Sequence, residues 1–272
     1  MSTLVVYVPG AAALVYLLAC LYLYLAQARQ IYKPLRDIAA TPADQGLRYD
    51  DVEFRTRDGV LLNGWYVSCP GARYVLMFFH GNTRNISYCL DSVRLFHRLG
   101  FDVFLFDYRG YGRSEGNPGE RGTYLDAEAA WRYLVDNRRV DRASIVMLGR
   151  SLGAAIASWL AVMHQPRALV IESTFTSLPD VAAEIYPYLP ARLLVRHRYP
   201  VAQNLPRIHC PLLVVHSRED EIIRFHHAAA LYALANGPKE LFEISGRHYD
   251  GYRTSGTEYE EGLARFFRRY LA

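Results

Sequence analysis

Gly149-Arg150-Ser151-Leu152-Gly153 is the stretch of sequence that decides the fold. The apolar run 144–148 precedes it and the small-residue run 153–162 follows it, so a strand, a sharp turn and a helix are expected in that order. In this context Gly-x-Ser-x-Gly predicts a nucleophilic serine, held in a strained backbone conformation. The outer glycines are needed because strand and helix pass close by on either side. The alternative is a glycine-rich turn without chemistry, and other parts of the chain decide between the two.

Strands and helices alternate along most of the chain. Strand patterns cover 52–56, 60–67, 74–79, 103–106, 144–148, 169–172, 212–216 and 240–244, and helical patterns cover 86–99, 124–137, 153–162, 225–235 and 258–270. This alternation predicts an α/β protein with a mostly parallel central sheet and helices on both faces. We expect three parts: an N-terminal transmembrane anchor at 1–28, a linker at 29–50 and one catalytic domain at 51–272.

Two loops downstream of Ser151 carry the groups that a serine nucleophile requires. A serine hydroxyl needs an adjacent base, and that base needs an acid to orient it. The strand at 212–216 leads into Ser217-Arg218-Glu219-Asp220-Glu221, and the strand at 240–244 leads into Ser245-Gly246-Arg247-His248. We interpret His248 as the base and Asp220 as the acid. Spacing alone leaves Glu219 and Glu221 open as alternatives to Asp220.

An oxyanion hole needs two backbone N–H groups aimed at the developing negative charge. The residue after the nucleophile, Leu152, supplies one of them at the start of the new helix. The other is expected from the loop after an early central strand. His80-Gly81-Asn82 follows the apolar run 74–79, so we assign the second amide to Asn82.

Four motifs in this order resemble a known family. They are Phe79-His80-Gly81-Asn82, Asp107-Tyr108-Arg109-Gly110-Tyr111-Gly112-Arg113-Ser114, Gly149-Arg150-Ser151-Leu152-Gly153 and Glu172-Ser173-Thr174-Phe175-Thr176-Ser177. The chain is similar, over about residues 30–272, to the membrane-anchored α/β-hydrolases that include eukaryotic protein depalmitoylases and bacterial relatives. The resemblance implies the α/β-hydrolase fold, esterase or thioesterase chemistry and a triad of Ser151, Asp220 and His248.

The chain departs from that family at two places. Relatives tend to have Gly-His-Asn-Asp where this chain has Arg247-His248-Tyr249-Asp250, and we expect Arg247 and Tyr249 to crowd His248. The eukaryotic depalmitoylases anchor through a cysteine-rich N-terminal segment, which Cys20 alone does not reproduce. The glycine-rich stretch 107–114 lacks a phosphate-binding motif, so we read it as a loop that supports the oxyanion region.

Composition excludes several other classes. Half of the 272 residues are hydrophobic (51%), and the formal net charge is only +4, which does not fit a disordered chain. Scattered arginines without an aromatic stacking platform argue against nucleic acid as a partner. Lys33 and Lys239 are the only lysines, an imbalance typical of a GC-rich bacterial genome. The cysteines have neither metal-ligand nor redox spacing, so we expect no metal and no disulfide; they are Cys20, Cys69, Cys89 and Cys210.

The N-terminus predicts a membrane-spanning helix. Residues 4–26 are almost wholly apolar, and no charged side chain precedes Arg29. A cleaved signal peptide and a lipoprotein site at Leu17-Leu18-Ala19-Cys20 are the alternatives. Arg29, Lys33 and Arg36 follow the span, so the positive-inside rule places the catalytic domain in the cytoplasm. We therefore expect a single-pass protein of the bacterial inner membrane.

The segment 178–204 is longer than a simple connection and is rich in Tyr, Pro and Leu. We interpret it as a small cap over an acyl pocket, in which Tyr186 and Tyr188 set chain-length preference; the alternative is packing on the sheet. The sequence thus predicts a cofactor-free serine hydrolase whose substrates are carboxylic esters or thioesters of acyl-lipid or acyl-protein type. A prolyl-oligopeptidase-type peptidase, an acyltransferase and a catalytically silent membrane scaffold stay as alternatives, and the sequence does not indicate an oligomeric state.

Overall fold

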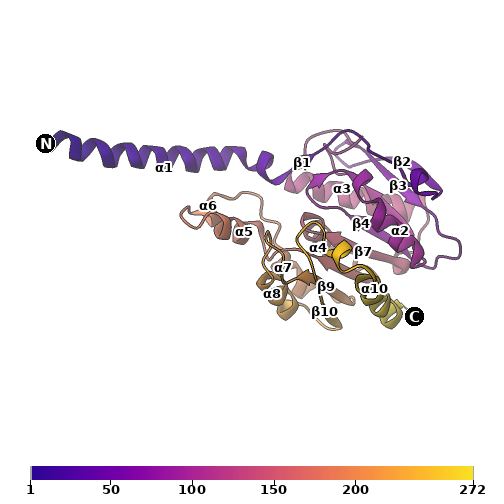
Figure 1. Ribbon diagram of the computed structural model, residues 1–272. Coiled ribbons are helices and arrows are strands. Elements are labelled where there is room, and N and C mark those ends of the chain that lie inside the picture. Colours follow the sequence, from indigo (N-terminus) through magenta and orange to yellow (C-terminus); the bar gives the residue numbers. More distant parts are fainter. Residues whose placement is uncertain (1, 272) are drawn as a thin grey trace.

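The chain is an α/β protein in which helices cover both faces of one large sheet (Figure 1). The computed structural model describes residues 2–271. The sheet has eight strands in the order β10-β9-β8-β7-β4-β6-β3-β2. The strands are β2 (Tyr49–Arg55), β3 (Leu61–Val67), β4 (Val75–Phe79), β6 (Asp102–Phe106), β7 (Ile145–Arg150), β8 (Ala168–Glu172), β9 (Leu212–Ser217) and β10 (Lys239–Ile244). All pairs from β10 to β6 are parallel, and β3 joins β6 and β2 antiparallel, which confirms the predicted fold class.

Two apolar cores form because successive strand residues face opposite sides of the sheet. Met77 and Phe79 of β4 pack into one core, whereas Leu76 and Phe78 pack into the other. The first core is closed by α3 (Glu120–Arg132), α4 (Leu152–His164) and α8 (His226–Leu234), and the second by α2 (Leu90–Arg98) and α10 (Gly256–Leu271). Strands buried on both faces read as continuous apolar runs, which is why their positions were readable from sequence.

Helix boundaries differ from the expected ranges at two points. The helix expected at 86–99 divides into a 3₁₀ turn, η2 (Ile86–Tyr88), and α2, because Asn85 caps the first turn by accepting the N–H of Ser87. The helix expected at 124–137 starts earlier, at Glu120, and ends in a π-helical turn, η3 (Tyr133–Asn137). Neither shift moves a predicted site residue.

The N-terminal helix α1 (Ser2–Ile31) projects from the domain (Figure 1). Its segment Pro9–Ile31 has a mean hydropathy of 1.8 and is long and apolar enough to cross a membrane. The residues after it pack against the domain: Tyr32 is buried, and β1 (Lys33–Pro34) pairs with β5 (Thr83–Arg84). A 3₁₀ turn, η1 (Pro42–Gln45), then leads to β2.

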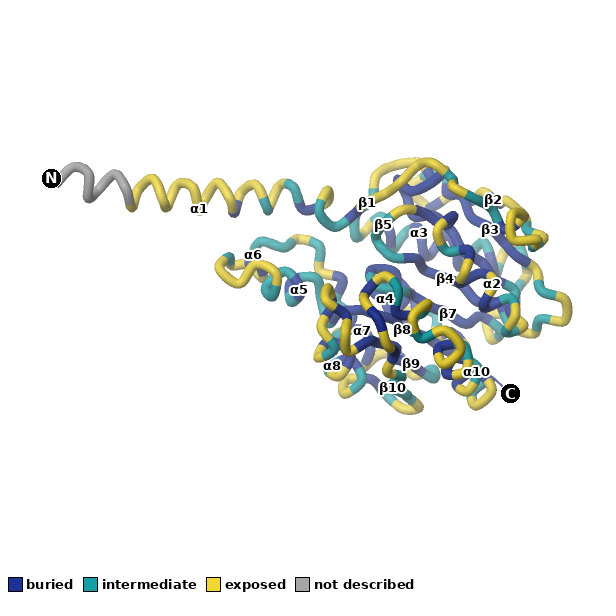
Figure 2. The backbone as a smooth tube through the Cα atoms, viewed as in Figure 1, coloured by how far each residue is buried: buried dark blue, intermediate teal, exposed yellow. Residues whose placement is uncertain are grey.

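The segment between β8 and β9 contains three short helices. They are α5 (Leu178–Ile185), α6 (Ala191–Leu194) and α7 (Val201–Asn204). α7 packs on α4, whereas α5 and α6 pack on each other; α5 is half-buried, and the chain becomes largely exposed from Ile185 into α6 (Figure 2). We call residues 178–195 the cap.

Candidate active site

Ser151 occupies the sharp turn between β7 and α4. Its backbone lies at φ 52° and ψ −120°, a conformation that few non-glycine residues adopt. A Cβ at Gly149 would lie 2.4 Å from the Cα of Ala154, and one at Gly153 would lie 2.2 Å from the carbonyl oxygen of Phe79. The flanking glycines are therefore required by the close approach of helix and strand. The local geometry is that of a nucleophile elbow.

Ser151, His248 and Asp220 form one chain of hydrogen bonds. Nε2 of His248 lies 3.1 Å from Oγ of Ser151, and its Nδ1 lies 2.8 Å from Oδ2 of Asp220. The other carboxylate oxygen of Asp220 accepts the N–H groups of Ile222 (3.0 Å) and Ile223 (2.8 Å). Burial alone would raise the pKa of Asp220, but His248 and the Ile223 amide outweigh it, so the pKa lies below its usual value. Asp220 is thus an ionised acceptor, Nδ1 donates to it, and Nε2 is left to accept the serine proton.

The neighbouring glutamates hold the histidine loop and do not touch the imidazole of His248. Glu219 accepts the N–H of Gly246 at 3.1 Å, and Glu221 accepts the backbone N–H of His248 at 3.2 Å. The geometry therefore favours Asp220 as the acid, the point that spacing left open.

Arg247 does not crowd His248, contrary to expectation, because its side chain points to solvent and pairs with Glu221. Tyr249 does approach: its ring lies edge-to-face with the imidazole of His248 at 5.0 Å between centroids.

The loop after β4 lies against the elbow, as the oxyanion assignment requires. A Cβ at Gly81 would lie 3.8 Å from that of Ser151. Within residues 2–271, neither the N–H of Asn82 nor that of Leu152 is engaged by a loop or side-chain acceptor, and Leu152 is the first residue of α4, where N–H groups lack a helical partner. Tyr108 donates to the carbonyl of His80 and Tyr111 to that of Asn82, so the 107–114 stretch supports this loop.

Two further groups that the sequence did not single out support the site. His216 on β9 donates to the carbonyl of Ile223 and lies 3.5 Å from Asp220, behind the acid. Arg150 forms two hydrogen bonds with Glu172, which also accepts from Tyr259, and so ties the end of β7 to β8 and α10. The spacing does not predict these contacts, because His216 meets Asp220 and Ile223 only through the turn after β9, and Arg150 meets Glu172 only through the pairing of β7 with β8.

Ser151 and His248 lie between two unlike pockets. The first is a cavity of about 290 Å³ with an apolar lining, between the end of α1 and the cap. The second is more polar than the first, and its lining includes Arg84, Arg150 and Asp250. Tyr186 lines the first pocket, whereas Tyr188 does not and is 89% exposed, so the expected role of Tyr188 in chain length is wrong.

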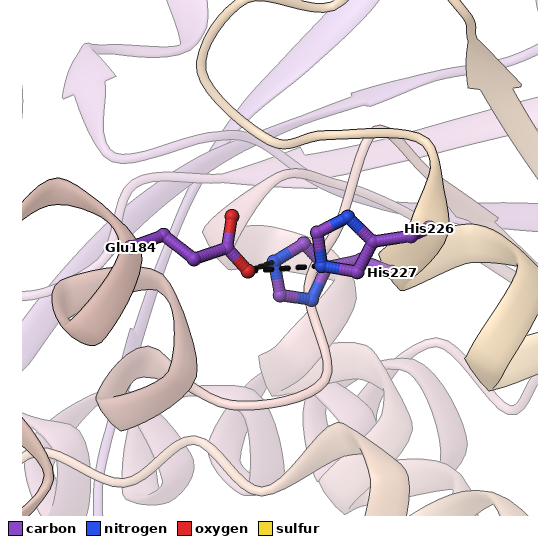
Figure 3. Close-up of side chains that lie close together, drawn as sticks. All are labelled: Glu184, His226 and His227. Carbon is purple, nitrogen blue, oxygen red and sulfur yellow. Dashed lines mark hydrogen bonds and ion pairs between the residues drawn. The ribbon is translucent and has the colours of Figure 1, made fainter. Parts of the chain in front are cut away.

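One group of side chains has the spacing of a metal site (Figure 3). Oε1 of Glu184 in α5 lies 2.9 Å from Nε2 of His226 and 3.1 Å from Nε2 of His227, both in α8. The N–H of Thr176 donates to Nδ1 of His227, which places the proton of neutral His227 on Nε2, facing Glu184. A protonated nitrogen is not a metal ligand. We therefore read the group as a clasp between the cap and the body of the domain.

Several known proteins are similar in sequence to this chain. The family described as "Serine aminopeptidase, S33" matches residues 70–199. An uncharacterised protein of Mycobacterium tuberculosis is 36% identical over 249 residues, which cover 90% of this chain and 89% of that protein. The α/β-hydrolase domain-containing protein WAV2 of Arabidopsis thaliana is 31% identical over 273 residues, 90% of this chain and 88% of WAV2. The chain belongs to the α/β-hydrolase family. With the elbow intact, this α/β-hydrolase is a serine hydrolase.

A solved structure agrees with the fold. An esterase of Pyrococcus furiosus superimposes with a TM-score of 0.74 at 22% identity, over 89% of this chain and 98% of that one. The protein bem46 of Schizosaccharomyces pombe extends the sequence family, at 32% identity over 86% of this α/β-hydrolase and 83% of bem46.

Proposed function

We propose that this α/β-hydrolase cleaves carboxylic esters or thioesters of long-chain acyl groups through an acyl-enzyme on Ser151. The observation that carries the proposal is the hydrogen-bonded chain from Asp220 through His248 to Ser151, which opens directly onto an apolar pocket. Ser151 is the nucleophile, His248 the general base and acid, and Asp220 the residue that orients the imidazole.

The first half of the reaction follows from this geometry. Nε2 of His248 takes the hydroxyl proton as Oγ of Ser151 bonds to the carbonyl carbon, and the carbonyl oxygen becomes an oxyanion. The N–H groups of Asn82 and Leu152 stabilise that charge. As the intermediate collapses, the bond to the leaving group breaks, and His248 passes its proton to the departing alkoxide or thiolate.

The second half of the reaction repeats these steps with water as the nucleophile. His248 removes a proton from water, whose oxygen attacks the acyl-enzyme carbonyl, and collapse returns the electron pair and proton to Oγ of Ser151. The products are a free acid and the regenerated serine. The proton balance closes without any other reactant.

The lining of the first pocket favours an acyl chain over a peptide substrate. An aminopeptidase must recognise a charged α-amino group, for which a carboxylate is the usual partner. Among the described residues that line this pocket there is neither Asp nor Glu, and most are aliphatic or aromatic. The lining of the first pocket therefore favours acyl hydrolysis over aminopeptidase activity.

The membrane location is also part of the proposal. We infer that α1 anchors the enzyme and that the catalytic domain lies on the cytoplasmic side of a bacterial inner membrane; the three basic residues Arg29, Lys33 and Arg36 after the span support this orientation. An anchor raises the local concentration of membrane-bound acyl substrates.

Turnover of p-nitrophenyl esters by the detergent-solubilised full chain tests the proposal. We expect hydrolysis by the wild type and a loss of at least about 10³-fold in kcat for both Ser151→Ala and His248→Ala. Arg218→Ala, a change at an exposed residue of the acid loop whose side chain pairs with Glu243, is the matched control and keeps wild-type rates. Turnover that survives in Ser151→Ala would exclude the proposed mechanism.

A further inference from the structure

The C-terminal end of α1 forms one wall of the apolar pocket. Leu23, Gln27 and Ile31 line it together with Ser151 and His248. Gln27 is buried, only 7% exposed, although it belongs to a helix whose neighbouring side chains are largely exposed. Nδ2 of Asn82 also donates to the carbonyl of Ile31, so the helix end touches the oxyanion loop. α1 is therefore part of the substrate site as well as a tether.

The cap lies along α1 over many residues (Figure 1). The side chain of Gln27 donates to the carbonyl of Leu194 at 2.8 Å and accepts the N–H of Arg196 at 2.8 Å. Farther towards the N-terminus, the hydroxyl of Tyr16 donates to the carbonyl of Tyr188 at 3.2 Å. The tip of the cap thus reaches the middle of the apolar helix.

The position of Tyr16 along α1 indicates how deep its contact with Tyr188 would lie in a membrane. Thirty residues make a helix of about 45 Å, whereas the hydrocarbon core is about 30 Å thick. Tyr22 and Tyr24 mark the interface, since tyrosines favour it and the guanidinium of Arg196 stacks over Tyr24 at 4.6 Å. Tyr16 lies eight residues before Tyr24, about 12 Å deeper along the axis. The cap tip beside Tyr16 therefore lies at the level of the acyl chains.

The surface of the cap tip suits that environment. Leu193 is 83% exposed and lies outside the pocket lining, and Ile185, at the pocket rim, is 55% exposed, so the cap presents large apolar side chains to its surroundings. Arg196 and Arg198, which follow the tip in sequence, are exposed, at a level where lipid headgroups carry negative charge. Arg192, within the tip, is also exposed and pairs with Asp180 at 3.3 Å. Apart from this ion pair, the surface is apolar at the tip and basic behind it, which matches a bilayer surface.

We propose that the cap tip, residues 185–194, inserts into the bilayer beside α1, and that the acyl chain of a membrane-embedded ester or thioester enters the pocket sideways between them. This inference rests on the proposed hydrolase function and names its substrate class: amphiphiles whose acyl chain stays in the membrane. The polar pocket on the other side of Ser151 then holds the leaving group, near Arg84 and Arg150.

Chain-length selectivity tests the route into the pocket. Leu23→Trp fills the α1 wall, and Leu17→Trp adds the same side chain to an exposed position of α1 outside the pocket. With full-length protein in phosphatidylcholine–phosphatidylglycerol vesicles, we expect Leu23→Trp to lower kcat/KM for p-nitrophenyl palmitate at least tenfold relative to p-nitrophenyl butyrate. Leu17→Trp should leave the palmitate-to-butyrate ratio unchanged. An unchanged ratio in Leu23→Trp would overturn the proposed acyl route.

Quenching by lipids brominated on their acyl chains tests insertion of the cap tip. Tyr188→Trp and Leu193→Trp place a fluorophore at the tip, and Leu234→Trp places one at an exposed site on α8 as the control. After subtraction of the wild-type signal from Trp65, Trp131 and Trp159, both cap variants should be quenched and Leu234→Trp should not. Absence of quenching in both cap variants would contradict insertion.

The two proposals fail in different ways. If no ester is turned over in a Ser151-dependent manner, the hydrolase proposal fails, and the substrate class fails with it. If turnover depends on Ser151 but the palmitate-to-butyrate ratio ignores Leu23→Trp, the hydrolase stands and the membrane route alone is wrong.

Discussion

Two backbone amides hold the carboxylate of Asp220 in the orientation in which it contacts His248. The N–H groups of Ile222 and Ile223 hold one carboxylate oxygen, so the other points at Nδ1 of His248. These bonds form because the chain turns tightly after β9. The orientation of the imidazole, and with it the direction of proton transfer, therefore depends on a carboxylate of this length at this position.

Asp220→Asn should lower kcat by about 10⁴-fold, because an amide at this position stabilises the wrong tautomer of the imidazole. Glu219→Gln, the neighbouring change, should cost less than about tenfold, since Glu219 contacts only the backbone of Gly246. Steady-state turnover of p-nitrophenyl butyrate compares them. Equal losses in the two variants would refute the assignment of Asp220.

Asp107 and His80 make stability depend on pH. Burial raises the pKa of Asp107 to about 8 and lowers that of His80 to about 4, so both are neutral at pH 7. An unfolded aspartate has a pKa near 3.9, so this group lowers the stability of the fold progressively as pH rises from about 4 to 8.

Asp107→Asn removes that ionisation. The Tm of the variant minus that of the wild type should grow between pH 5 and pH 9 by at least about 4 °C, since about 1 kcal/mol moves Tm by 2–4 °C in a chain of this size. Thermal unfolding followed by circular dichroism at several pH values measures it. A constant difference would show that Asp107 is ionised throughout.

Among the secondary-structure elements, the turn at Ser151 depends on how closely the backbones around it approach each other. The start of α4 approaches the end of β4 so closely that a Cβ at Gly153 would lie 2.2 Å from the carbonyl oxygen of Phe79. A side chain at Gly153 must push α4 away from the end of β4, and this displaces both Ser151 and the Leu152 amide.

Gly153→Ala should lower Tm by at least about 2 °C, because overpacking typically costs about 1–3 kcal/mol, and should abolish esterase activity. Gly119→Ala, at the N-cap of α3, meets nothing within 4 Å; it should keep wild-type turnover and lower Tm only by the small cost of a weaker cap. Thermal unfolding and ester turnover are measured on both. A Gly153→Ala protein as stable and active as Gly119→Ala would mean that the elbow tolerates a wider spacing.

The sequence predicted elements well where burial is simple. The strands β4, β7 and β9 are buried on both faces, and their apolar runs predicted them to within about two residues. The start of α3 at Glu120 was missed because no apolar period marks its first turn; Thr123 and the carboxylate of Glu120 instead meet Tyr199 and its neighbours near the cap. Such tertiary contacts carry no local signal.

At the scale of the whole molecule, α1, the cap and the oxyanion loop meet at one place. The sequence predicted the order of Ser151, Asp220 and His248, since each residue follows the carboxyl end of a parallel strand of the same sheet. The sequence did not predict that Leu23 and Gln27 of α1 line the pocket, because this depends on how the cap lies across α1. The division at residues 28 and 50 remains a proposal; α1 runs to Ile31, and residues 32–47 pack on the domain.

Sidedness is testable on the intact protein. Alkaline phosphatase fused after Ala272 is active only when exported, so it should be inactive in a bacterial host, and a green fluorescent protein fusion at the same place should fluoresce. The opposite pattern would place the catalytic domain outside the cytoplasm.

The central claim is that Ser151 becomes acylated, and covalent labelling tests it most directly. The solubilised full chain is treated with a fluorophosphonate, digested with trypsin and analysed by mass spectrometry. The peptide from Ser151 to Arg167 contains two serines, Ser151 and Ser158, which fragmentation distinguishes. We expect the adduct on Ser151, and none in His248→Ala. A folded wild type that stays unlabelled, or an adduct on another residue, would contradict it.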